Sequence, residues 1–199
     1  MMRDLRPLLA RADWSIGQRP GAPTGATLHF NGPPVVGAAD VAACIRQLQA
    51  DARYHMRPDA FGPGAAGDGI MYHYAALPDG AIGVLRDERD ELWHAANTTA
   101  NRWHLAIHIP IGGAQAPTPA QWRACTDLLE QLAARYHWPG RQVVLGHREW
   151  PRSDGKPQKP CPGPILFRLL QTWRGQLAAA EPYRVAYDGT RVRQGPGPA

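Results

Sequence analysis

Short strand-like runs alternate with amphipathic helical patterns along most of this chain, and this alternation limits the folds open to it. The predicted strands span residues 26–30, 70–77, 81–85, 103–111 and 141–145. The predicted helices span residues 40–54, 118–138 and 165–177. Strands and helices that interleave over residues 26–180 predict one α/β domain, in which helices flank a single mixed central β-sheet.

Local sequence signals mark where several of these elements begin and end. Pro78-Asp79-Gly80 separates the second and third strand runs and is typical of a hairpin turn. Thr118 precedes a proline and stands three residues before Gln121, which is the pattern of a capping box at a helix start. Residues 58–69 are rich in Gly and Pro and are predicted to form a loop.

Both ends of the chain differ from the alternating pattern. Residues 1–25 are polar and turn-rich, and we expect a lead-in segment there. Residues 182–199 are rich in Gly, Pro and Arg, and we expect a separate tail. The predicted domain therefore spans residues 26–181.

Charge and hydropathy narrow the classes of partner. The formal net charge of +5 favours an anionic partner such as nucleic acid, a cell-wall polymer or a membrane surface. The basic residues are scattered and form no recognised nucleic-acid-binding motif, so we expect no nucleic acid partner. No run approaches the roughly 20 apolar residues of a membrane span. The first 15 residues lack the apolar run of roughly 7–15 residues of a signal peptide, which predicts synthesis in the cytoplasm without a leader.

Three residues have positions suited to a metal site. His29 ends one predicted strand, and His147 follows another. Cys161 lies in a proline-rich loop two residues after Lys159, whose ammonium would lower the pKa of a thiol. Two histidines and one cysteine would leave a fourth tetrahedral position for water, which is the catalytic form of a zinc site. The other cysteines, Cys44 and Cys125, lie on apolar helix faces and are expected to pack as small hydrophobic groups.

Six short motifs follow one another in a characteristic order between residues 26 and 180. They are Thr27-Leu28-His29, Tyr72-His73-Tyr74 with Asp79-Gly80, Trp93-His94-Ala95, Asn101, Gly146-His147-Arg148-Glu149 and Lys159-Pro160-Cys161-Pro162-Gly163. In this series the chain resembles the zinc-dependent N-acetylmuramoyl-L-alanine amidases of the phage-lysozyme and peptidoglycan-recognition-protein superfamily. The resemblance implies the fold of that superfamily.

The resemblance also implies roles for individual residues. It makes His29, His147 and Cys161 the ligands of one zinc ion per chain. It makes Tyr72 and Lys159 the catalytic residues.

Three further residues are implied to lie near the substrate: His94, Asn101 and His108. Some branches of the superfamily have a glutamate base where His108 stands here, so the sequence favours the tyrosine/lysine type of site. His108 is also an even number of residues from His104, so both face the same side of a strand.

The implied activity is hydrolysis of the amide bond between N-acetylmuramic acid and L-alanine in bacterial peptidoglycan, by a protein that acts as a monomer. Two alternatives stay open: a non-catalytic peptidoglycan-binding module of the same fold, and a cytosolic amidase that recycles muropeptides. The presence of Cys161, Lys159 and Tyr72 favours hydrolysis. A wall substrate combined with the missing leader favours a lytic phage endolysin that acts on the wall after release.

The tail has a resemblance of its own. Residues 191–197, Arg-Val-Arg-Gln-Gly-Pro-Gly, resemble the opening strand and turn of bacterial Src-homology-3-like wall-binding domains. The tail is therefore the stub of such a domain, an edge strand docked on the amidase, or a Gly/Pro-rich terminus without fixed structure. In each case we expect residues 182–199 to be dispensable for hydrolysis.

Overall fold

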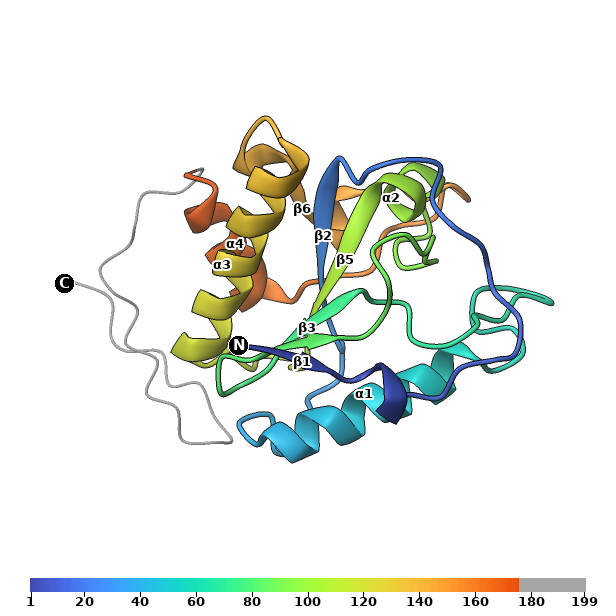
Figure 1. The fold of residues 1–199 in the computed structure, drawn as a ribbon, viewed down its shortest axis with the longest axis horizontal. Coiled ribbons are helices and arrows are strands. Elements are labelled where there is room, and N and C mark those ends of the chain that lie inside the picture. The colour runs from blue at the N-terminus through green and yellow to red at the C-terminus, as the bar shows by residue number, and fades with distance from the viewer. Residues whose placement is uncertain (176–199) are drawn as a thin grey trace.

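The computed structural model describes residues 1–175, which contain one six-stranded sheet (Figure 1). Its strands are β1 (Met2–Asp4), β2 (Gly25–Phe30), β3 (Tyr74–Ala76), β4 (Ile82–Val84), β5 (His104–Ile109) and β6 (Val144–Gly146). Their spatial order is β1-β4-β3-β5-β2-β6. The β3–β4 pair is antiparallel and the other neighbouring pairs are parallel, so the predicted mixed sheet is confirmed.

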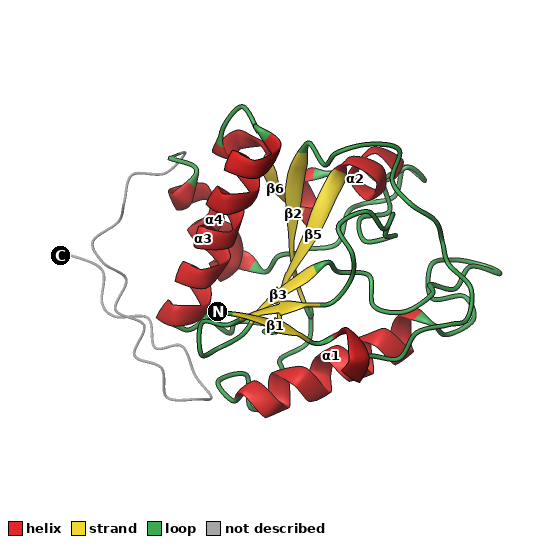
Figure 2. Ribbon diagram, in the orientation of Figure 1, coloured by secondary structure: helices red, strands yellow, loops and turns green. Residues whose placement is uncertain are grey.

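Helices cover both faces of this sheet. The α-helices are α1 (Val41–His55), α2 (Thr98–Trp103), α3 (Pro119–Tyr136) and α4 (Pro164–Trp173). Short 3-10 turns occur at Arg6–Leu8, Arg141–Val143 and His147–Glu149. In Figure 2, α3 and α4 lie side by side on one side of the sheet and α1 lies on the other. None of the described helices is long and apolar enough to cross a membrane.

The two faces of the central strands bury different chemistry. On one face, Leu105, Ile107 and Ile109 of β5 pack with the apolar sides of α3 and α4 in the main hydrophobic core. On the other face, Leu48 of α1 belongs to a second apolar cluster with Ala75 of β3 and with Ala81 and Leu85, which flank β4. The predicted packing roles of Cys44 and Cys125 are confirmed, since both are buried in apolar surroundings. The part of this second face formed by β2 and β5 carries polar residues instead, and the candidate site lies there.

The predicted capping box and hairpin turn are present, and a further side-chain cap begins α1. The side chain of Asp40 accepts a hydrogen bond from the Ala43 amide at the start of α1. Thr118 and Gln121 form a reciprocal capping box at the start of α3. The β3–β4 hairpin turns through Gly80, whose φ of 85° lies in the left-handed region that favours glycine.

Several predicted strands are shorter in the structure. The run at 141–145 begins as a 3-10 turn, and β6 starts at Val144. The run at 103–111 loses Trp103 to α2, a helix that was not predicted. The run at 70–77 retains only Tyr74–Ala76 as a strand, and the Met71 amide before it donates to the His55 side chain. An apolar run in the sequence indicates that its residues are buried. Burial alone does not show that their backbone pairs with a neighbouring strand.

The expectation of a lead-in segment at residues 1–25 needs correction, because this segment is part of the sheet. Met2–Asp4 forms the edge strand β1 parallel to β4, and Leu5 is buried in the second apolar cluster. The pairing joins residues about 80 positions apart, which local sequence pattern does not reveal. The predicted tail, residues 182–199, lies outside the described residues.

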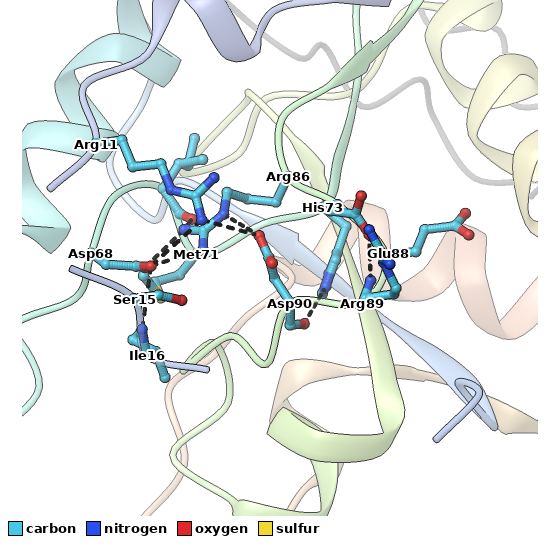
Figure 3. A network of polar contacts seen from close by, with 12 residues as sticks. Arg11, Ser15, Ile16, Asp68, Met71, His73, Arg86, Glu88, Arg89 and Asp90 are labelled. Carbon is cyan, nitrogen blue, oxygen red and sulfur yellow. Dashed lines mark hydrogen bonds and ion pairs between the residues drawn. The ribbon is translucent and has the colours of Figure 1, made fainter. Parts of the chain in front are cut away.

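An ion-pair network connects this N-terminal segment to the domain (Figure 3). Its residues Asp68, Arg86 and Asp90 are buried, and Arg11 is half-exposed. Arg86 donates two hydrogen bonds to Asp68, at 2.8 and 3.0 Å, and a third to Asp90 at 2.8 Å. Arg11 approaches the same two carboxylates at 4.0 and 3.7 Å, and the Ile16 amide donates to Asp68. We refer to Arg11, Asp68, Arg86 and Asp90 as the ion-pair network.

Candidate metal centre and cleft

Two neighbouring parallel strands bring His29 and His147 together. Leu28 of β2 pairs with Gly146 of β6, so the next residue of each strand lies at the same carboxyl edge. The two imidazole rings have centroids 4.8 Å apart. The carboxyl ends of parallel strands are common ligand-binding positions in open α/β sheets. The structure therefore brings these two predicted ligands together.

The loop that carries Cys161 is held against the end of β6. The Arg148 amide donates to the Cys161 carbonyl at 2.5 Å, and the Arg148 guanidinium donates to the Pro162 carbonyl at 3.0 Å. A Cβ atom at Gly146 would lie 2.7 Å from Pro162 Cδ, so this close approach requires glycine. Because Arg148 directly follows His147, one short segment positions both a histidine and the cysteine.

The three side chains form a buried cluster that we call the metal centre: His29, His147 and Cys161. One ligand atom from each lies within 4.8 Å of the others, and His29 Nδ1 is 3.7 Å from Cys161 Sγ. His147 Nε2 is buried and has no hydrogen-bond partner among the described residues. Imidazole nitrogen and thiolate sulfur are ligands that zinc prefers. The residues present therefore fit a zinc ion, and such an ion would give His147 Nε2 the partner it lacks.

Burial sets the protonation of these groups. Burial, followed by repulsion from His147, lowers the pKa of His29 well below its usual value. Burial and the nearby Lys159 lower the pKa of His147 to about 4. Both imidazoles are thus neutral near pH 7, which is the state that binds metal.

Two opposing effects act on the protonation of Cys161. Burial raises the pKa of its thiol to about 12, and the smaller opposing effect of Lys159 does not overcome burial. The predicted lowering effect of Lys159 on this pKa is thus present, but burial outweighs it. A bound dication supplies a much larger positive charge and deprotonates a coordinating thiol.

A cleft of about 780 Å³ opens over the metal centre. Tyr72 and Lys159, the two predicted catalytic residues, line it together with all three candidate ligands. Aromatic side chains also line it, contributed by Tyr54, Phe61 and Trp93.

Tyr72 is held rigidly between other rings. It stacks on His108, with ring centroids 4.2 Å apart and an interplanar angle of 7°, and its ring centroid is 5.3 Å from that of His29. Burial, then the charges of Asp51 and Cys161, raise the pKa of Tyr72 well above its usual value. The phenol therefore keeps its proton near pH 7 and acts as a hydrogen-bond donor.

The three predicted substrate-binding residues have different positions. His94 lines the cleft and also contacts His29, with His29 Nε2 3.0 Å from His94 Nδ1. Asn101 lies in α2 and accepts a hydrogen bond from the Ala95 amide at 3.0 Å. His108 is fully buried beneath Tyr72 and bonds Asn31. Contact of these three residues with substrate stays a prediction.

Asp51 is a cleft residue that sequence reasoning missed. Its carboxylate accepts two hydrogen bonds from Asn31 Nδ2, at 3.0 Å each, and one from Gln47. Burial raises the pKa of Asp51. A signal was available: Gln47, Asp51 and His55 are spaced by four residues and form a polar stripe along one side of α1. All three line the cleft.

Comparison with protein families identifies one matching model. Residues 19–164, most of the chain, match the family described as N-acetylmuramoyl-L-alanine amidase. The match includes every residue placed here in the metal centre, together with Tyr72 and Lys159.

Two mammalian relatives carry the description "N-acetylmuramoyl-L-alanine amidase". The human protein is 27% identical over 175 residues, which cover 86% of this chain and 28% of that protein. The pig protein is 28% identical over 149 residues, which cover 73% of this chain and 22% of that protein. The chain thus spans about a quarter of the length of these relatives.

Solved structures share the fold at low sequence identity. Drosophila peptidoglycan recognition protein SD matches with a TM-score of 0.67 and 21% identity, over 87% of this chain and 94% of that one. Human PGRP-IβC, solved in complex with glycosamyl muramyl pentapeptide, matches with a TM-score of 0.65 and 14% identity, over 86% and 95%. At these identities the comparison establishes the fold alone.

Proposed function

Since the chain belongs to the N-acetylmuramoyl-L-alanine amidase family, we propose that it cleaves the amide bond between N-acetylmuramic acid and L-alanine in peptidoglycan. We propose further that it does so with one zinc ion held by His29, His147 and Cys161. One observation carries this proposal: the three buried ligand atoms lie within 4.8 Å of one another in the cleft that Tyr72 and Lys159 also line.

Different groups in the cleft serve different steps of the proposed hydrolysis. A zinc ion bound at the centre supplies a Lewis acid and lowers the pKa of water towards ~7. Tyr72 keeps its proton and donates a hydrogen bond to the carbonyl oxygen of the scissile amide as negative charge develops there. Lys159 adds a positive charge at the cleft wall, which favours the same charge development.

The leaving nitrogen of L-alanine must receive a proton. His94 does not suit this step, because its Nε2 is bonded to the Ala100 carbonyl and its Nδ1 to His29. Tyr72 and Lys159 remain as the donors. A general acid must lie within hydrogen-bond reach of the atom that it protonates, and both side chains face the cleft.

The cleft also suits a glycopeptide. Tyr54, Phe61 and Trp93 offer aromatic surface to sugar rings, and Asp51 and Arg152 offer opposite charges to the peptide. The human structural neighbour was solved with a muramyl pentapeptide, which supports a substrate of this class.

Digestion of purified sacculi tests the proposal. Mass spectrometry of the products should show free N-acetylmuramic acid ends and peptides that begin with L-alanine. A chelator should abolish the release of these products, and added zinc should restore it. Tight binding to sacculi without bond cleavage, with or without zinc, would instead identify a non-catalytic binding module.

We also propose that the protein acts on the intact wall as a lytic enzyme of the endolysin type, released from the cell that makes it. The formal net charge of +5 supports this role, since it favours association with an anionic polymer. Comparison of kcat/KM on intact sacculi and on soluble muropeptides separates this role from recycling. Preference for sacculi that weakens at high salt supports the lytic role, and preference for soluble muropeptides contradicts it.

A further inference from the structure

We propose that His94 is a positioning residue that fixes the tautomer of His29, so that the His29 Nδ1 lone pair faces the metal centre before an ion arrives. This inference rests on the proposed metal-dependent function. It assigns to His94 a role that acts through His29, whereas the sequence resemblance places His94 near the substrate.

A backbone carbonyl fixes which ring nitrogen of His94 carries the proton. His94 Nε2 lies 3.1 Å from the carbonyl oxygen of Ala100. A carbonyl oxygen can only accept a hydrogen bond, so His94 Nε2 must carry the proton. In a neutral imidazole the other nitrogen then has a lone pair, so His94 Nδ1 is an acceptor.

The hydrogen bond between His94 and His29 then fixes the protonation of His29. His94 Nδ1 lies 3.0 Å from His29 Nε2, and an acceptor at His94 requires a donor at His29. His29 Nε2 therefore carries the proton of that ring. His29 Nδ1 is left with a lone pair, and it lies 3.7 Å from Cys161 Sγ in the metal centre.

The opposite tautomers are disfavoured by the surroundings. A proton on His94 Nδ1 would leave its Nε2 lone pair facing the Ala100 carbonyl at 3.1 Å, so two acceptors would meet. His94 is 7% exposed and His29 is 1% exposed. Buried acceptors left without a donor cost free energy, so burial enforces a single tautomer pair.

The second histidine ligand is oriented by the same segment of chain. His147 makes a hydrogen bond to the backbone of Ala95, and its Nε2 has no partner among the described residues. Its Nδ1 therefore donates to the Ala95 carbonyl, and its Nε2 lone pair is free for a metal. The side chain of Asn101 holds the Ala95 amide at 3.0 Å. Residues 94–101 thus set the orientation of both imidazole ligands.

Nitrogen chemical shifts in the metal-free wild-type protein test the tautomers directly. Long-range ¹⁵N–¹H spectra at about pH 8, above the ordinary pKa of histidine, distinguish protonated from bare ring nitrogens. We expect protonated Nε2 and bare Nδ1 in both His29 and His94. A proton on Nδ1 of His29, or rapid exchange between its tautomers, overturns the proposal.

Metal affinity tests the consequence. Chelator competition should show that His94→Leu weakens zinc binding by about 10–100-fold, the effect typical of losing a partner of a metal-bound histidine. His94→Gln should restore most of the affinity, because its amide offers one acceptor and one donor. His104→Leu is the matched control: this residue is also a buried histidine, but it bonds Thr27 rather than a ligand. We expect wild-type zinc affinity in the control.

The outcomes separate this inference from the proposed function. Unchanged zinc affinity in a folded His94→Leu variant overturns the positioning role, whatever the activity on sacculi. Equal losses in His94→Leu and His94→Gln also overturn it, because a purely steric role would not be rescued by hydrogen bonding. The expected tautomers and affinities, in a protein that does not cleave sacculi, would refute the amidase function and keep the inference.

Discussion

The ion-pair network and the metal centre, both within the described residues, differ in whether their polar side chains have partners. In the ion-pair network, two arginines face two aspartates, and all four side chains have partners. In the metal centre, three neutral groups meet, and His147 Nε2 has no partner in the described part of the chain. Buried polar atoms are nearly always hydrogen-bonded, so an unpartnered one needs an explanation. The ion-pair network is explained by structure alone, whereas the zinc ion that we propose would explain the unpartnered nitrogen of the metal centre.

The largest expected effect comes from breaking the metal centre. Cys161→Ala and His147→Ala should lower turnover on sacculi by about 10³-fold or more, because the Lewis acid is lost with the ion. Zinc content measured by atomic absorption should fall with the activity. The melting temperature of the metal-free protein should fall modestly in His147→Ala, because the hydrogen bond of His147 to the Ala95 backbone is lost while no partner of Nε2 is lost.

A substitution in the ion-pair network should lower stability and leave zinc binding unchanged. Asp68→Ala leaves Arg86 buried with one of its two carboxylates missing, and such a loss costs about 3–5 kcal/mol of unfolding free energy. Denaturant unfolding of the metal-free protein measures this cost. The folded fraction should keep its zinc stoichiometry, and a selective loss of zinc would show that the two clusters are coupled.

Variants of the proposed catalytic residues should differ from variants of the proposed ligands in the amount of zinc that they bind. Tyr72→Phe and Lys159→Ala should lower kcat by about 10²–10³-fold, the usual cost of losing one electrostatic donor to a developing oxyanion. Both proteins should keep one zinc and a wild-type melting temperature. If both turn over at the wild-type rate, the chemistry lies with other residues of the cleft.

The pH dependence of stability should reveal the buried neutral histidines. Burial lowers the pKa of His104 to about 4, below the value of about 6.5 expected in the unfolded chain. Between these two pKa values the folded state binds fewer protons than the unfolded state. The free energy of unfolding is therefore highest above about pH 6.5 and falls as the pH drops towards 4. His104→Gln should reduce that acid slope by up to about 1.4 kcal/mol per pH unit. An unchanged slope would mean that His104 is protonated in the folded protein.

The sequence predicted the strand-end histidines because their signal is local. His29 and His147 each stand at the carboxyl edge of an apolar run, and parallel pairing of β2 and β6 makes the two edges meet. Cys161 was predicted as a ligand from the family resemblance and from its stiff loop. Local sequence spacing does not determine where a loop of this length meets the rest of the fold. The raised pKa of its thiol also escaped prediction, because burial is a property of the folded protein.

The missed elements are those whose stability comes from distant partners. β1 is three residues long and polar, and it exists because β4 offers an edge. α2 is a six-residue helix with two threonines and a tryptophan, which have modest helix propensity, and Asn97 caps it. Propensity is too weak to predict such short elements, and tertiary contacts decide them.

The smallest effect is expected from a change at residues that belong to neither the metal centre nor the ion-pair network. Deletion of residues 182–199 should leave turnover and melting temperature within experimental error of the wild-type values. Every side chain assigned to metal binding, proton donation or the ion-pair network lies between Arg11 and Cys161, and the apolar clusters found among the described residues extend no further than Trp173. A lone strand or hairpin is only marginally stable in water, so a short tail adds little to the free energy of folding unless it docks on the domain.

Turnover on sacculi and thermal unfolding of the full and shortened chains measure the effect of the deletion. A large drop in melting temperature would show that the tail docks on the domain, and weaker binding to sacculi with unchanged turnover on soluble muropeptides would show that it targets the wall.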